Sequence, residues 1–377
     1  MKTKKVSSPI SDKRETNLEL YRIIMMLLIV MHHYVVNSGL LSEGGPIYSD
    51  IGAKRSILLL LLGTWGKSAI NGFLLMTGFF MCNKNLTAKK YAMLLGETMF
   101  YKIVINAVFF CTGREAVTKG SVLSALLPVK TVNDSVSQIV LVFLLFIPFL
   151  NVLINNLTEK NHLRLLGLSL FVYVFLGSFA FLGVRMNYLS WFIVLYLTGS
   201  YFGRYRKKVF ERRKLWGYLM LFSLGVSLAT VINGINKGSN ALLYLNEVNK
   251  LLPFTNGLTT FMFFKSVKLP YNRIINYIAA STYGVFLIHT SGDAMRQFLW
   301  KDLLRVTKAY YLSWPLLLLH IFGSVLGVYA VCTLIDILRR KFVEKPLFGL
   351  WDKYFPAFKE KYGIFEDRVC KRLNISQ

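Results

Sequence analysis

The sequence predicts an all-α protein, a polytopic bundle of about ten transmembrane helices. Of its 377 residues, 54% are hydrophobic and 15% aromatic, and the mean hydropathy is +0.46. A chain of this composition cannot cover its surface with polar residues as a soluble domain does. Apolar runs long enough to cross a bilayer fall near 18–38, 56–82, 91–111, 138–156, 164–183, 186–203, 215–233, 251–268, 274–291 and 311–338.

The placement of charge predicts the orientation in the membrane. The net charge is +26, and with the N-terminus inside, about 30 of the 45 lysines and arginines fall on the inner side. Both termini are then cytoplasmic, with a basic arm at 1–15, a transmembrane domain at 16–338 and a basic and aromatic tail at 339–377. The densest basic loop, 204–214, is expected to contact anionic membrane lipids and not nucleic acid.

The first span holds an arginine and two histidines inside an apolar run, TNLELYRIIMMLLIVMHHYVVN. A charged side chain at the centre of a bilayer helix costs about 3 kcal/mol, so Arg22 and His33 are candidates for function. Thr16 and Glu19 have the spacing of a capping box, which predicts the start of the helix. The first span is therefore the stretch on which the functional argument depends.

Arg22 and His33 are predicted to share one face of the first helix. Their separation along the chain corresponds to three turns plus about 20° and to about 16 Å along the axis, and His32 points about 100° away. We expect Arg22 near a membrane surface and His33 deep in the span, with Arg22 holding an anionic group and His33 acting further in. In the other interpretation, Arg22 reaches lipid phosphates and His33 bonds between helices.

The second and third spans contain further buried charges. Lys67 and Asn71 are four residues apart and lie on one face of the second span. Lys67 either binds an anionic donor or pairs with Glu97 of the third span. The partner of Lys102 cannot be assigned from the sequence. The loop at 112–137 is long and apolar enough to form a lid or re-entrant segment.

The remaining histidines and the cysteines give weaker signals. His289 follows an apolar run and precedes Thr290 and Ser291, so it either faces the same site as His33 or is a wet interfacial residue. His162 is expected on the surface and His320 in a packing or hydrogen-bonding position. The four cysteines are scattered without metal-ligand or redox spacing, so no metal site is predicted.

Five segments, taken together and in order, carry a family resemblance. Arg22, ten residues and His33 form the first, and the others read GKSAINGFLLMTGFF, WFIVLYLTGSYFGRY, STYGVFLIH and FVEKP. This order resembles the acyltransferase 3 family of bacterial integral membrane acyltransferases, over nearly the whole chain. The sequence departs from the family pattern at Thr77, where a serine is usual, and at Gly72, where a larger residue is expected.

The resemblance implies an enzyme of the bacterial plasma membrane that moves an acyl group, commonly acetyl. The donor would be cytoplasmic acetyl-CoA, a co-substrate, and the acceptor a hydroxyl of a cell-surface polysaccharide or its lipid-linked precursor. Carried over by position, Arg22 and His33 match the catalytic pair, while Lys67, Asn71 and His289 match substrate-binding positions. The related chains often have an acidic residue directly after the last histidine, where this chain has Thr290.

The chemistry of acyl transfer needs a base for the hydroxyl proton and a donor for the developing oxyanion. A desolvated, neutral His33 suits the first task, and Arg22 suits the phosphates of CoA. The alternative function is a transporter or flippase of lipid-linked sugars, with polar groups lining a path. Transporters often contain paired repeats, and the first span has no counterpart later in the chain, which favours the enzyme.

Overall fold

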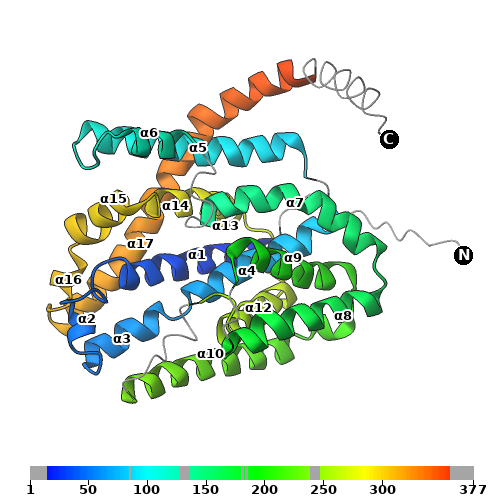
Figure 1. The fold of residues 1–377 in the computed structure, drawn as a ribbon, viewed down its shortest axis with the longest axis horizontal. Coiled ribbons are helices and arrows are strands. Elements are labelled where there is room, and N and C mark those ends of the chain that lie inside the picture. The colour runs from blue at the N-terminus through cyan, green and yellow to red at the C-terminus, as the bar shows by residue number, and fades with distance from the viewer. Residues whose placement is uncertain are drawn as a thin grey trace, which may run out of the picture. The chain divides into compact units, whose positions relative to one another are not determined.

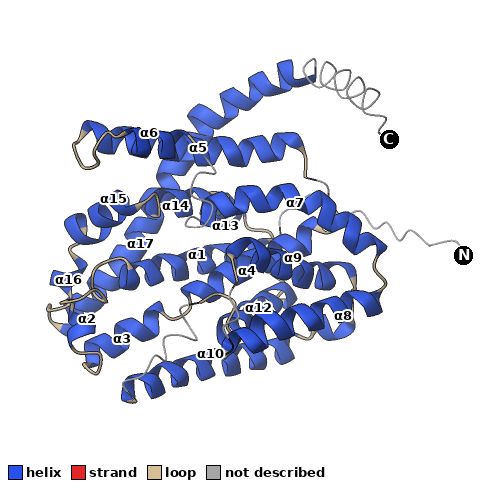
Figure 2. Ribbon diagram, viewed as in Figure 1, coloured by secondary structure: helices blue, strands red, loops and turns tan. Residues whose placement is uncertain are grey.

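The computed structural model describes residues 15–84, 86–127, 136–179, 182, 186–237 and 247–356. The described chain is helical and contains no strand (Figure 2), which confirms the predicted all-α class. The basic arm, apart from Glu15, and the tail beyond Pro356 lie outside the described residues. Contacts divide the chain into two units, Met1–Thr333 and Leu334–Gln377.

Every predicted span contains a helix. The helices are α1 (Thr16–Val36), α2 (Pro46–Ser49), α3 (Lys54–Gly63), α4 (Gly66–Met81), α5 (Ala88–Cys111), α6 (Lys119–Leu126), α7 (Val136–Asn156), α8 (Glu159–Leu170), α9 (Tyr188–Arg204), α10 (Arg213–Asn236), α12 (Leu251–Ser266), α13 (Arg273–Ala279), α14 (Thr282–His289), α15 (Asp293–Arg296), α16 (Val306–Ala309) and α17 (Trp314–Arg339). Short π or 3₁₀ segments lie at Phe171–Phe175, Leu176–Ser178, Lys208–Glu211, Gln297–Leu303 and Arg340–Glu344.

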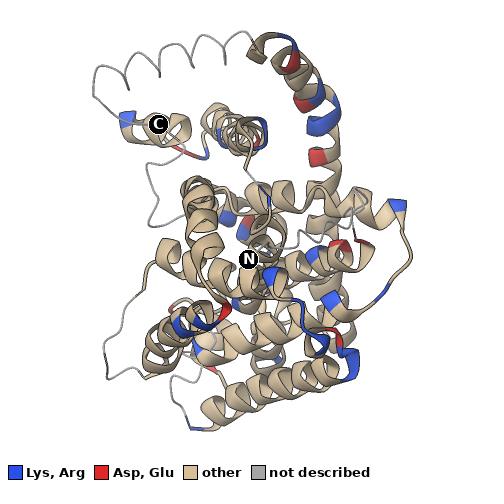
Figure 3. Ribbon diagram, turned by 90° about the vertical axis from the view of Figure 1, so that its right-hand side faces the viewer, with Lys and Arg blue, Asp and Glu red and all other residues tan. Residues whose placement is uncertain are grey.

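Seven helical stretches within the described residues are long and apolar enough to cross a membrane: Thr16–Val36, Lys54–Met81, Ala88–Cys111, Val136–Asn156, Glu159–Ser178, Arg213–Asn236 and Trp314–Pro356. The other predicted spans correspond to α9, α12 and the broken pair α13 and α14, whose helices are shorter. In the first unit the helices carry few charged residues along their lengths (Figure 3). These features show a membrane protein.

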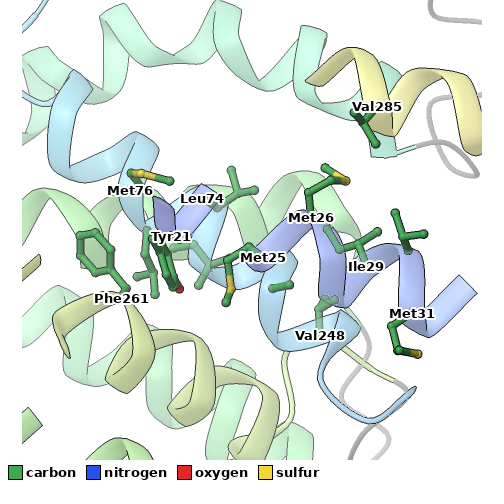
Figure 4. Close-up of a cluster of buried hydrophobic side chains, with 14 of the residues drawn as sticks. Tyr21, Met25, Met26, Ile29, Met31, Leu74, Met76, Val248, Phe261 and Val285 are labelled. Carbon is green, nitrogen blue, oxygen red and sulfur yellow. The ribbon is translucent and has the colours of Figure 1, made fainter. Parts of the chain in front are cut away.

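Helix α1 lies inside the first unit and packs against α3, α4, α12, α13 and α14 (Figure 1). Its apolar side chains form a buried cluster with residues of α4, α12 and α14 (Figure 4). Tyr21 is fully buried there, and its hydroxyl contacts the Thr260 hydroxyl at 3.1 Å. A Cβ on Gly72 would lie 2.1 Å from the Tyr21 hydroxyl oxygen, so the glycine at this position allows α1 and α4 to approach.

The start of α1 differs from the predicted capping box. Glu15 is the N-cap residue and makes no side-chain capping bond, so Thr16 is already helical. The Thr16 hydroxyl accepts a hydrogen bond of 2.9 Å from the backbone N–H of Asn272. Asn272 in turn caps α13 through the backbone N–H groups of Ile274 and Ile275. The capping-box prediction was wrong because a tertiary partner takes the threonine hydroxyl.

The second unit continues helically from α17 to Pro356, where the sequence predicts a separate tail from residue 339. Within this unit, Arg339 contacts Asp336 at 2.9 Å and Glu344 at 2.7 Å, and Arg340 contacts Asp336 at 3.2 Å. Asp336 is fully buried and Arg339 nearly so. This ion-pair network holds the α17 end to the π-helical segment that follows it.

Candidate active site at the end of helix α1

Two histidines from distant parts of the sequence meet at the end of α1. His33 lies in the last turn of α1, and its Nδ1 is 3.0 Å from Nε2 of His289, the last residue of α14. His289 is completely buried and His33 partly so. The sequence predicts His33 deep in the span, whereas it lies three residues from the helix end. The chain after the helix remains buried at Ser38 and Leu40.

The hydrogen bonds of this pair define its tautomers. His289 Nδ1 is 2.6 Å from the carbonyl oxygen of Val285, so Nδ1 carries the hydrogen and donates it. In the neutral ring, Nε2 then accepts, and His33 Nδ1 must be the donor to it. The positions of these ring protons are inferred from the hydrogen-bonding partners of each nitrogen. His33 Nε2 is left with a lone pair, the arrangement of a base oriented by a second group.

The neighbouring His32 has different surroundings. Its Nδ1 lies 2.8 Å from the carbonyl oxygen of Gly63, where α3 ends, and the side chain is only 7% exposed. A Cβ on Gly66, where α4 begins, would be 2.2 Å from Cβ of His32. The break between α3 and α4 therefore provides both a carbonyl acceptor and the space that His32 occupies.

Two cationic side chains lie near His33. Lys67 and Arg296 lie close enough to His33 to act on it electrostatically. Among the described residues, no carboxylate oxygen lies within 4 Å of the Lys67 ammonium group, so the predicted alternative of a Lys67–Glu97 pair is absent. Arg296 pairs with Asp293 at 2.9 Å through one terminal nitrogen. Lys67 also lies in the first turn of α4, where the helix dipole favours anions.

Arg22 lies toward the opposite end of α1, about 16 Å along the axis from His33. It pairs with Glu19 at 3.7 Å, and its side chain is 34% exposed. α1 is one unbroken helix from Thr16 to Val36, so the helical geometry between Arg22 and His33 is uninterrupted. An unbroken helix is what the predicted common face of Arg22 and His33 requires.

Comparisons with known proteins show to which family the chain belongs. A family model described as an acyltransferase domain matches residues 138–337, which is 200 of the 377 residues. The chain belongs to the acyltransferase 3 family. No curated protein and no solved structure gave a significant match. The matched region includes His289, whereas Arg22, His33, Lys67 and Asn71 precede it. In this acyltransferase, the histidine pair thus joins the matched region to the first helix.

Asn71 has a different environment from Lys67, although both are on α4. Its amide nitrogen donates to the carbonyl oxygen of Val248 at 2.7 Å, and its oxygen accepts from Trp191 Nε1 at 2.9 Å. Asn71 is completely buried. The amide therefore links α4 to α9 and to the segment before α12 of the acyltransferase, and its substrate-binding role stays a prediction.

Lys102 has partners that the sequence could not assign. Its ammonium group donates to the carbonyl oxygens of Ser124 at 2.9 Å and Leu127 at 3.4 Å, at the end of α6. A cation at this position interacts favourably with the helix dipole. The described part of the 112–137 loop thus forms a short helix attached to α5.

No described group of three His, Cys, Asp or Glu side chains is arranged to hold a metal.

Two other histidines have structural positions. His162 was predicted on the surface, but it is completely buried, with Nε2 at 3.0 Å from the carbonyl oxygen of Leu197. The prediction was wrong because α9 covers the first turn of α8. His320 bonds the Tyr34 hydroxyl and the carbonyl oxygen of Leu304, each at 2.9 Å, as expected of a hydrogen-bonding residue.

Arg296 is the site residue that the sequence reasoning missed. It follows His289 by seven residues, which corresponds to two helical turns, but Gly292 with φ of 104° interrupts the helix between them. The sequence signal that could have identified Arg296 is its position as a basic residue two helical turns after His289.

Proposed function

We propose that this acyltransferase moves an acyl group, most simply acetyl, from cytoplasmic acyl-CoA to a hydroxyl of a cell-surface polysaccharide or its lipid-linked precursor. It acts in the bacterial plasma membrane with both termini in the cytoplasm. The observation that carries the proposal is the chain of hydrogen bonds from His33 through His289 to Val285. Family membership supports acyl transfer, and the histidine pair supplies the base that it requires.

The proposed reaction has two proton steps at one atom. His33 Nε2 takes the proton of the acceptor hydroxyl as its oxygen attacks the thioester carbonyl. The resulting imidazolium keeps its Nδ1 hydrogen bond to His289. When the carbon–sulfur bond breaks, Nε2 returns the proton to the leaving thiolate, giving the acyl ester and CoA. Lys67 and Arg296, whose charges act on His33, are the groups that we propose stabilise the negative charge on the carbonyl oxygen.

The separation of Arg22 from His33 fits a donor with two distant functional groups. CoA carries phosphates at one end and its thioester at the other, joined by an extended arm. If Arg22 binds the phosphates at the cytoplasmic end, an arm crossing about 16 Å brings the thioester to His33. This arrangement explains why a charged residue and a base occupy opposite ends of one helix face.

The test is a pair of asparagine variants at the neighbouring histidines. Asparagine carries an amide nitrogen at the same number of bonds from Cα as Nδ1, so His33→Asn retains a donor to His289 and lacks Nε2. His32→Asn likewise retains a donor to Gly63. We expect His33→Asn to lower CoA release and glycan acylation about 10² to 10⁴-fold, and His32→Asn to retain substantial activity at matched protein levels.

Measurements use purified protein with acetyl-CoA and the cell-envelope glycan fraction, with NMR to locate the new ester. Wild-type turnover in the His33→Asn variant would exclude His33 Nε2 as the base. Acetyl-CoA-independent movement of lipid-linked sugar across vesicles, without ester formation, would instead support the transporter alternative.

A further inference from the structure

A cavity lies at the same end of α1 as His33, and its lining begins at Ser38. It has a volume of about 470 Å³, and its lining includes Ser38 and Glu43 from the segment after α1, together with Lys301, Lys308 and Tyr311. The surrounding elements, α2 and α16, lie together at one end of α1 (Figure 1). With a cytoplasmic N-terminus, this end of α1 faces outward. The cavity is therefore open to the side where a cell-surface acceptor is found.

The cavity is close enough to His33 for one bound molecule to reach both. Ser38 is completely buried and follows His33 by five residues. The backbone N–H of Asn37 still bonds the carbonyl oxygen of His33 at 2.9 Å, so the chain between them is compact. Five residues at helical rise span about 8 Å, which is comparable to the length of one or two sugar rings.

The charge of the segment before α17 is unusual for an outer loop. Translocated loops are normally poor in lysine and arginine, but residues 290–313 contain Arg296, Lys301, Arg305 and Lys308 against Asp293 and Asp302. The segment therefore carries two more positive than negative charges, which favours a negatively charged partner.

The two acidic residues of this segment already have partners. Asp293 pairs with Arg296 at 2.9 Å, and Asp302 accepts from Arg114 at 2.6 Å and from Gln297 at 3.2 Å. The hydrogen bond from Arg114 lowers the pKa of the Asp302 carboxyl below its usual value, so the carboxylate stays charged. In the described part of the chain, neither Lys301 nor Lys308 has a carboxylate oxygen within 4 Å.

We infer that this cavity binds the acceptor as an anionic glycan, with a carboxylate or phosphate of the sugar chain between Lys301 and Lys308. The inference rests on the proposed function. The lysines supply charge-assisted hydrogen bonds to the anion, Glu43 accepts from sugar hydroxyls, and the exposed ring of Tyr311 offers an apolar face. An acceptor held in this way directs a neighbouring sugar hydroxyl toward His33.

The experiment measures glycan binding to the full chain in phosphatidylcholine nanodiscs. The probes are fluorescent tetragalacturonate, a glycerol phosphate tetramer and neutral maltotetraose. We expect one or both anionic probes to bind more tightly than maltotetraose, with affinity that falls as salt is added. The relative affinity of the two anionic probes distinguishes carboxylate from phosphate as the recognised group.

The variant is the double substitution Lys301→Gln and Lys308→Gln, with Lys54→Gln as the matched control. Lys54 is exposed at the same end of α1, has the same charge and lies outside the cavity lining. The double variant should raise the Kd of the bound anionic probe about tenfold, and replacing both lysines by arginine should restore binding. Lys54→Gln should leave the Kd unchanged.

Other outcomes would overturn the inference. These are equal binding of neutral and anionic probes, equal loss in Lys54→Gln, or no lysine-dependent binding of either anionic probe. If phosphatidylglycerol in the nanodisc abolishes the lysine dependence, the lysines bind lipid headgroups and the inference is wrong. CoA release by His33→Asn with acetyl-CoA and the cell-envelope glycan fraction tests the proposed function separately, because probe binding measured without acetyl-CoA does not depend on the base.

Discussion

The two sides of α1 around His32 and His33 show how neighbouring residues of one type acquire different roles. On one side, His32 donates to the Gly63 carbonyl and fills the space beside Gly66. On the other, His33 bonds the ring of His289 and keeps a nitrogen lone pair. The two rings are 5.7 Å apart between centroids. The chemical identity of the partner, more than burial, separates a packing histidine from a candidate base.

A second difference concerns what surrounds each ring. The His32 side is closed by two helix ends whose glycines bring backbone into contact with α1. On the His33 side, the charges of Lys67 and Arg296 act on the ring, and a cavity lined by Ser38 and the residues after it lies at the same end of α1. A base needs access to a substrate hydroxyl, whereas a packing residue needs its space filled. Variants on each side should therefore affect different measurements.

The largest effect on the His33 side, apart from His33 itself, is expected from its positioning residue. His289→Ala removes the acceptor that holds the His33 tautomer, and we expect kcat to fall about 100-fold while the KM for acyl-CoA stays constant. His289→Gln places an oxygen at the same number of bonds from Cα as Nε2, so it should recover much of the loss. Steady-state kinetics of CoA release measure both variants.

A His289→Gln variant as inactive as His289→Ala, with unchanged thermal stability, would show that His289 does more than accept a hydrogen bond. Wild-type kcat in His289→Ala would show that His33 is oriented without it.

The His32 side should respond in stability. Gly66→Ala places a Cβ where His32 already lies, 2.2 Å from its Cβ, so α1 and α4 must separate. Overpacking of this kind costs about 2 kcal/mol, which should lower the thermal unfolding temperature of the detergent-solubilised protein. Gly225→Ala is the control, because it lies within α10 and its Cβ would meet nothing within 4 Å. An unchanged unfolding temperature in Gly66→Ala would contradict the close packing at the break.

The sequence was sufficient for the fold and for part of the site. Hydropathy predicted a helix in each of the ten apolar runs, and seven of these runs lie in described helical stretches long and apolar enough to cross a membrane. Helical periodicity placed Arg22 and His33 on one face, and α1 is unbroken between them. The sequence did not predict the break at Gly63–Gly66, because a hydropathy average extends across an interruption of two residues. The roles of Thr16 and His162 depended on Asn272 and Leu197, which are distant in sequence. Local patterns cannot reveal such partners.

The site itself was only partly predictable for the same reason. Arg22, His33 and Lys67 are noticeable because charged or titratable groups are unfavourable in apolar runs. The contact of His33 with His289 joins residues 256 positions apart, and only the packing of α14 on α1 creates it. The hydrogen bond that the Asn71 amide oxygen accepts from Trp191 Nε1 also became evident only from the structure.

The smallest expected effect concerns Tyr34, which follows His33 and tests whether the site extends further around α1. Its hydroxyl contacts His320 Nδ1 at 2.9 Å, and His320 Nε2 donates to the carbonyl oxygen of Leu304. Nδ1 is therefore the acceptor, and Tyr34→Phe leaves it without its donor. We expect a loss of about 1 kcal/mol in stability with normal turnover, measured by thermal unfolding and CoA release. Tyr218→Phe, at an exposed position on α10, should change neither. A loss of turnover in Tyr34→Phe at unchanged stability would show that Tyr34 contributes to the reaction. The functional side of α1 would then include Tyr34 as well as His33.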